Sequence, residues 1–198
     1  METMSAGHDL SARSVILSVI LVEGISDQLA LEALARRRGR DLPAEQVSIV
    51  AMRGVTNIAK FLEQFGPRGA GVNLAGLYDV GEEAGFQRAL ERAGFGVNLT
   101  RPEMERLGFF ACVADLEDEL IRSLGAAAVE RVLESQGELG AFRTFQGQPE
   151  WRGRPAEEQL RRFMGTRGGR KIQTAARLVE ALDLANVPRP LDGVLAHV

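Results

Sequence analysis

The sequence predicts an α/β protein with a Rossmann-type parallel sheet of about four strands flanked by helices, and a helical C-terminal extension. Short apolar runs alternate with segments of helical spacing four times before residue 125. This alternation is typical of parallel strands joined by helices. The chain has 198 residues, of which 45% are hydrophobic. It can therefore bury a substantial core, which excludes global disorder and a disulfide-stabilised scaffold.

Each predicted strand is a short apolar run with a helical segment after it. SVILSVILV has the continuous aliphatic composition of a strand buried on both faces. We expect strands at 14–22, 47–52, 72–78 and 108–114, and helices at 28–38, 57–65, 82–94 and 115–125. Further helices are predicted at 126–136, 155–165 and 169–184, with Pro188 and Pro190 ending the last one.

Charge and composition divide the chain near residues 137–155. The formal net charge is -3, yet the stretch 143–177 carries 9 basic and 3 acidic side chains. The segment TFQGQPEWRGRP, rich in glycine, proline and glutamine, interrupts the helical pattern there. We therefore predict a flexible N-terminus at 1–14, an α/β domain at 15–137, and a basic helical extension at 138–198 that packs on it.

Three features predict a cytoplasmic protein. The single cysteine, Cys112, cannot form an internal disulfide and fits a reducing compartment. The longest apolar stretch, 15–22, is too short to span a membrane. The first fourteen residues lack the pattern of a secretory signal.

Carboxylates follow three of the four predicted strands. Glu23 comes directly after the first strand, Asp79 after the third and Asp115 after the fourth. Because ligands bind beyond the carboxyl ends of parallel strands, we expect these three side chains to form one acidic cleft. Oxygen ligands without histidine or cysteine suit Mg²⁺ or Mn²⁺. Such ions support phosphoryl transfer.

A structural role is the alternative for several of these acids. Asp27 and Asp115 stand where a carboxylate caps a helix N-terminus, and Glu82 and Glu83 where one complements the helix dipole. Glu23 fits this alternative less well, because it ends an apolar strand before the helix begins.

Several blocks of the sequence resemble the Toprim domain, the metal-dependent module of topoisomerases, primases and certain nucleases. The blocks are VEG-x-SD, RG-x-x-N-x-x-x-F and GLYD, each after a predicted strand. With DLEDEL and the lysine of GRKIQTAARL, they are most similar to the nuclease part of the overcoming-lysogenization-defect (OLD) endonucleases. The resemblance spans residues 15–184.

The resemblance implies roles for individual residues. Glu23 would be a metal ligand or general acid/base, and Lys171 would stabilise negative charge on the phosphate that is cut. The basic turn before the last predicted helix would contact a nucleic-acid backbone; a solvated basic face is the alternative. The implied metal ligands are Glu23, Asp27, Asp79, Asp115 and Glu117. Independently of the resemblance, the basic turn predicts Arg167, Arg170 and Lys171 as nucleic-acid contacts.

The sequence departs from the family pattern in two places. Gly81 stands where the second aspartate of the Asp-x-Asp motif belongs. Glu82 or Glu83 substitutes for it, or the site holds one ion, or it holds none. The ATPase domain that precedes the Toprim part of OLD nucleases does not fit in this length, and GTRGGRK fails the P-loop pattern.

Three hypotheses follow. The first is a Mg²⁺- or Mn²⁺-dependent endonuclease acting on DNA, with a homodimer compatible. The second is a catalytically degenerate Toprim module that binds nucleic acid or docks on a separate ATPase. The third is a doubly wound domain that binds a small phosphorylated ligand near Gly24 or Gly54.

Overall fold

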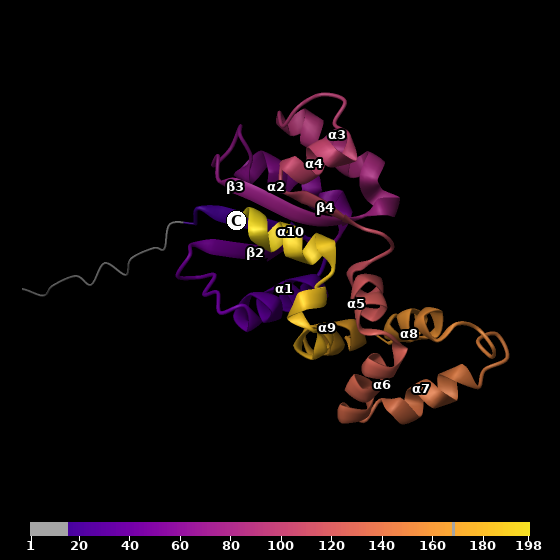
Figure 1. The fold of residues 1–198 in the computed structure, drawn as a ribbon. Helices are drawn as coiled ribbons and strands as arrows, with labels where there is room; N and C mark the ends of the chain where they lie inside the picture. The colour runs from indigo at the N-terminus through magenta and orange to yellow at the C-terminus, as the bar shows by residue number, and fades with distance from the viewer. Residues whose placement is uncertain (1–15, 168) are drawn as a thin grey trace, which may run out of the picture.

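In the computed structural model, which describes residues 16–167 and 169–198, four parallel strands form a sheet of order β2-β1-β3-β4 (Figure 1). Ser18 of β1 pairs with Val47 of β2 and with Asn73 of β3, and Gly76 of β3 pairs with Phe109 of β4. The predicted α/β fold is confirmed. The strands are β1 (Ser18–Val22), β2 (Val47–Ala51), β3 (Asn73–Asp79) and β4 (Phe109–Cys112). The prediction for residues 1–14 lies outside the described residues.

Helices cover both faces of the sheet. The first face packs on α2 (Ile58–Phe65), α3 (Glu83–Ala93) and α4 (Arg101–Arg106). The opposite face packs on α1 (Ile25–Arg37) and α10 (Arg189–His197). Alternate residues of a strand point to opposite faces, so Val19 and Leu21 join the first cluster while Ile20 and Val22 join the second. This explains why β1 is apolar throughout.

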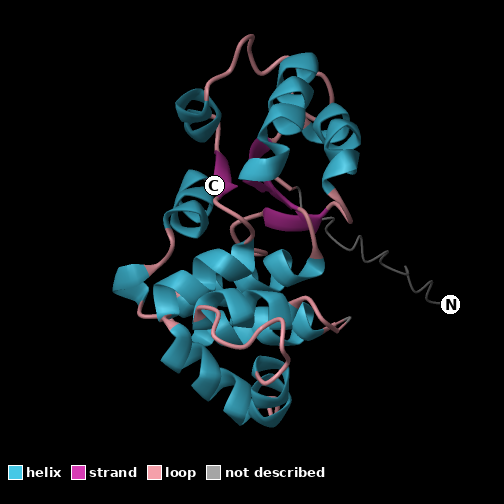
Figure 2. Cartoon of the chain, turned by 90° about the vertical axis from the view of Figure 1, so that its right-hand side faces the viewer, coloured by secondary structure: helices cyan, strands magenta, loops and turns pink. Residues whose placement is uncertain are grey.

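The remaining helices form a layer that extends away from the sheet (Figure 2). They are α5 (Leu116–Leu124), α6 (Ala126–Ser135), α7 (Leu139–Gln146), α8 (Ala156–Met164) and α9 (Arg170–Ala181). Three short 3₁₀ turns lie at Val55–Asn57, Val80–Glu82 and Leu184–Asn186. Helix α9 packs along α1 and on α5, so residues from both sides of position 137 share one apolar cluster. The domain boundary near 137 stays a prediction.

Three helices are absent from the sequence prediction. Pro188 and Pro190 do not end the helical part: Pro190 lies in the first turn of α10, where its missing N–H costs nothing. Helix α7 falls at the edge of the predicted break and is held by Phe142 and Phe145 in the core. Helix α4 begins with a capping box in which the carboxylate of Glu103 accepts a hydrogen bond from the Thr100 backbone N–H at 2.8 Å.

Candidate functional site

The carboxyl ends of three strands meet in one acidic pocket of about 270 Å³. Its chemistry comes from the strand ends, from the first turns of α1 and α5, and from α9. The six residues singled out as metal ligands or as the catalytic lysine all line it: Glu23, Asp27, Asp79, Asp115, Glu117 and Lys171. The structure thus places together side chains that are up to 148 positions apart in sequence.

Asp27 has both a capping position and an acidic environment. Its Oδ2 accepts a hydrogen bond from the backbone N–H of Gly24 at 2.8 Å, as expected for a helix cap. Burial, with a smaller contribution from the negative charges of Glu117, Glu23 and Asp79, nevertheless raises the pKa of Asp27 to about 7 against the effect of that hydrogen bond. The cap and the site therefore use the same carboxylate.

Asp79 ends β3 and faces the carboxylates of the neighbouring strands. Burial raises its pKa to about 7, and the charges of Glu23 and Asp115 act in the same direction. Lys171 opposes this rise. The carboxyl groups of Asp27 and Asp79 therefore keep their protons up to a pH of about 7, because burial and the neighbouring negative charges disfavour their ionised forms.

The first turn of α5 supplies two further carboxylates. Asp115 is the N-cap, and its Oδ1 accepts a hydrogen bond from the Asp118 backbone N–H at 2.8 Å. Its Oδ2 lies 3.4 Å from the Lys171 Nζ. Glu117 is 2% exposed and pairs with the same ammonium group at 2.9 Å through Oε2. Its Oε1 is buried without a hydrogen-bond partner among the described residues.

Lys171 is the cation that these carboxylates surround. Burial would lower the pKa of its ammonium group, but the charges of Glu117 and Asp115 outweigh burial and raise it. The lysine therefore stays charged and neutralises part of the acidic pocket.

A comparison with known protein families matches the part of the chain that contributes Glu23, Asp27 and Asp79 to the acidic pocket. Residues 17–80 match the family model described as the overcoming lysogenization defect protein-like TOPRIM domain. This segment is similar to an OLD-like Toprim domain. Among curated protein sequences, none matches the chain.

Solved structures extend the similarity beyond the Toprim segment at the level of the fold. The C-terminal region of the Burkholderia pseudomallei OLD protein superposes with a TM-score of 0.71 at 20% identity, covering 92% of this chain and 96% of that one. The corresponding region of the Xanthomonas campestris pv. campestris OLD protein gives 0.72 at 22% identity, covering 92% and 91%. The helices after the Toprim segment are therefore part of the shared fold.

The side chains that line the acidic pocket suit a divalent cation with oxygen ligands. The buried Glu117 Oε1 lacks a partner, and the carboxyl groups of Asp27 and Asp79 have raised pKa values. An unpartnered buried oxygen and raised pKa values are both expected of carboxylates that are crowded together to bind a cation. Within residues 16–167 and 169–198, no three Asp, Glu, His or Cys side chains are yet grouped closely enough to hold an ion. Glu117 and Asp115 turn to Lys171 instead.

The predicted replacements for the missing aspartate lie elsewhere. Glu83 pairs with Arg101, whose Nε is 3.2 Å from its Oε1, and Glu82 is exposed. Neither belongs to the described residues that line the acidic pocket. At Gly81 an added Cβ would meet nothing within 4 Å, so the position is open.

Arg170, the first residue of α9, does not have the exposure that the predicted nucleic-acid contact requires. This side chain is 7% exposed, and its guanidinium lies 3.8 Å from the centre of the Phe163 ring. It donates hydrogen bonds to the Phe163 carbonyl, to Thr166 Oγ1 and to Glu138 Oε2. Arg170 therefore packs the helical layer and is not available to a nucleic-acid backbone. Arg167, whose side chain is 73% exposed, remains accessible.

The aromatic and polar candidates have structural places. Trp151 stacks on Phe145 at 5.0 Å, and the Arg154 guanidinium lies 4.9 Å from its ring. The indole ring is therefore already engaged in two contacts within the protein. The Asn57 amide donates to the Met52 carbonyl at 2.9 Å, which fixes the turn after β2.

Two residues that lie near the acidic pocket are not among those predicted from the sequence. Glu119 is buried, accepts a hydrogen bond from the Val113 N–H at 2.7 Å and pairs with Arg122, so it holds the loop after β4. Arg161 of α8 places its Nε 3.4 Å from Asp115 Oδ2. The local excess of arginine is the sequence signal for Arg161, but it does not single out that residue.

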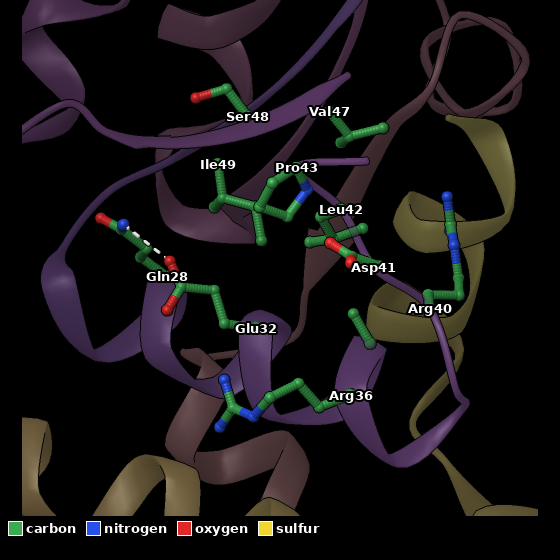
Figure 3. Close-up of a pocket in the computed structure, with 11 residues that line it drawn as sticks. Gln28, Glu32, Arg36, Arg40, Asp41, Leu42, Pro43, Val47, Ser48 and Ile49 are labelled. Carbon is green, nitrogen blue, oxygen red and sulfur yellow. Dashed lines mark hydrogen bonds between the residues drawn. The ribbon is translucent and has the colours of Figure 1, made fainter. Parts of the chain in front are cut away.

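A second, larger pocket of about 740 Å³ lies between α1 and β2 (Figure 3). Leu42, Val47 and Ile49 form its apolar part. At its rim the Gln28 amide donates to Glu32 Oε1 at 2.9 Å.

None of the helices in the described part of the chain is both long and apolar enough to cross a membrane.

Proposed function

We propose that this protein is a metal-dependent nuclease that hydrolyses phosphodiester bonds in DNA. The observation that carries the proposal is the gathering of five carboxylates and one lysine in a single pocket at the carboxyl edge of the sheet. The OLD-like Toprim segment supports it, because that family comprises nucleases. Glu23, Asp27, Asp79, Asp115 and Glu117 would hold one or two Mg²⁺ or Mn²⁺ ions.

The ion would supply Lewis-acid stabilisation of the phosphate and neutralise the carboxylates. The chain's own residues orient the reacting groups. Glu23 stands at the exposed end of β1, next to a glycine backbone that lets a ligand approach, and is placed to hold a water or take up its proton. Lys171 would exchange Glu117 for a phosphate oxygen and offset the developing negative charge.

Plasmid nicking with Mg²⁺ or Mn²⁺, and with EDTA as the metal-free control, tests the proposal. We expect cleavage by the wild-type protein and at least a 100-fold loss in Glu23→Gln, which keeps the size of the side chain and removes its charge. Equal rates for both proteins would remove Glu23 from the chemistry, and no cleavage with either ion would refute the nuclease.

A second candidate function is a Toprim module that binds nucleic acid, or a separate ATPase protein, without cutting. Gly81 and the pairing of Glu117 with Lys171 favour it, because both leave an ion with fewer ligands. Calorimetric titration with Mn²⁺ separates the two. Saturable binding that Asp79→Asn abolishes supports the nuclease, whereas no binding at millimolar Mn²⁺ supports the module.

A further inference from the structure

The acidic pocket continues into a groove along α8. This groove, of about 320 Å³, shares Asp115 and Lys171 with the acidic pocket as common walls. Its other lining residues come from α8 and the loops on either side of it: Trp151, Glu158, Arg161, Arg162 and Gly165. A ligand that reaches Lys171 therefore has an adjoining space on the side of α8.

Arg161 stands at the junction of the two spaces. Its Nε lies 3.4 Å from Asp115 Oδ2, and the Lys171 Nζ lies 3.4 Å from the same oxygen. Two cations thus share one carboxylate oxygen. If an ion takes Asp115 as a ligand, that oxygen can no longer neutralise both cations. Lys171 then keeps its ion pair with Glu117, whereas Arg161 has no second carboxylate partner within residues 16–167 and 169–198.

The groove has an excess of positive charge that its own acids do not cancel. Glu158 is paired with Arg154, whose Nη1 lies 2.6 Å from its Oε1, and Asp115 is paired as described. Arg162 is exposed and makes no side-chain hydrogen bond or ion pair within residues 16–167 and 169–198. Its guanidinium is available to an anion from outside.

The aromatic residue of the groove, Trp151, already stacks on Phe145 at 5.0 Å and has the Arg154 guanidinium 4.9 Å from its ring. A base that stacks on Trp151 would have to compete with both contacts. Contacts to phosphates of a nucleic-acid strand remain, and such contacts position a substrate without reading its sequence.

We infer that Arg161 and Arg162 bind the phosphate next to the one in the acidic pocket, so that a single nucleic-acid strand lies along α8. This subsite reads the backbone and not the bases. The inference rests on the proposed function for the identity of the acidic pocket, but it concerns binding and can be measured without cleavage.

Fluorescence anisotropy of a labelled 20-nucleotide single strand tests the subsite, in EDTA and again with Ca²⁺, over a range of salt concentrations. We expect the double variant Arg161→Ala/Arg162→Ala to bind at least tenfold more weakly at low salt. The slope of log affinity against log salt should fall by about 0.7, the value for one phosphate contact of a single strand. Arg162→Ala alone should give about half of this change, and it cannot act through Asp115.

The matched control is Arg88→Ala/Arg92→Ala. It removes the same charge from exposed positions of α3 on the opposite face of the sheet. We expect its affinity to stay within twofold of wild type. Equal losses in both double variants would reduce the effect to net charge and overturn the subsite.

Parallel nicking assays separate the inference from the proposed function. If wild type cuts and the Arg161/Arg162 variant binds and cuts equally well, the subsite is wrong and the nuclease stands. If wild type binds without cutting and the variant loses binding, the subsite stands and the nuclease is wrong. A wild-type protein that neither binds nor cuts overturns both.

Discussion

The acidic pocket and the larger α1–β2 pocket both use α1, but they differ in how their charges are neutralised. Beside the α1–β2 pocket, the Arg40 guanidinium donates to Glu45 Oε2 at 2.8 Å, and this hydrogen bond lowers the pKa of Glu45. In the acidic pocket, five carboxylates share one cation, Lys171, which pairs with Asp115 and Glu117, and the pKa values of Asp27 and Asp79 rise to about 7.

The two pockets show that the volume of a pocket and the balance of its charges vary independently. The larger pocket has about 740 Å³ and is lined by two acids, Glu32 and Asp41, and two arginines, Arg36 and Arg40, so its lining charges balance. The smaller one has about 270 Å³ and an excess of carboxylates, which is costly unless a cation or protons compensate it. Unbalanced charge, and not volume, is therefore the better guide to function in this molecule.

Removing Lys171 should produce the largest effect in this comparison. We expect Lys171→Gln to lower the nicking rate by about 100-fold, because a positioned charge near the phosphate is lost. The buried Glu117 loses its partner at the same time, which should lower the free energy of unfolding by roughly 2 kcal/mol. Nicking kinetics and urea unfolding measure the two effects.

Lys60→Gln is the control for that variant. Lys60 is the other lysine of the chain and is exposed on α2, so its loss should change neither quantity. Lys171→Arg should restore stability, because it keeps the charge. A Lys171→Gln protein as active as wild type would exclude the lysine from the reaction.

The pH dependence of stability should give the next largest effect. Asp27 and Asp79 have an ordinary pKa of 3.8 and a raised value of about 7 in the folded protein. Between these values the folded state binds more protons than the unfolded state, so its stability falls as pH rises. In EDTA we expect the free energy of unfolding to decrease by about 2 kcal/mol from pH 5 to pH 8, since partial exposure reduces the full shift.

Two controls tie this fall to the acidic pocket. Asp27→Asn should flatten the profile, and Mn²⁺ should restore stability at pH 8 by neutralising the same carboxylates. A stability that rises with pH across this range would contradict the raised pKa values.

The smallest effect is expected in the α1–β2 pocket. Glu32→Gln makes on α1 the same isosteric change as Glu23→Gln, but in the pocket whose lining charges balance. It should leave the nicking rate within twofold and the free energy of unfolding within about 0.5 kcal/mol. A large loss of cleavage in this variant would break the comparison and make the larger pocket part of the site.

The fold was predictable where one residue pattern has one solution. The strands β1 to β4 are apolar runs between helical segments, and their parallel order follows from that alternation. Proline was ambiguous, because Pro188 and Pro190 fit both the end of one helix and the first turn of the next. Helix α7 was missed because tertiary packing of Phe142 and Phe145 holds it within a polar, glycine-rich region.

The site was predictable where sheet topology decides it. The ends of β1, β3 and β4 had to meet, so Glu23, Asp79 and Asp115 could be grouped from their positions alone. Neighbouring basic residues could not be sorted in this way. Arg170 and Lys171 are adjacent, yet one turns into the helical layer and the other into the acidic pocket. Helix rotation decides between them, and it depends on packing against α1 and α5.

That packing also sets the order in which the site can be completed. The Arg37 guanidinium in the last turn of α1 donates to the carbonyls of Val179 and Leu182, which lie 142 and 145 residues later in the chain. The carboxylates can gather while the protein is still being synthesised, but the lysine joins them only after α9 has emerged and docked. A fragment that ends before α9 would therefore carry the carboxylates without their cation.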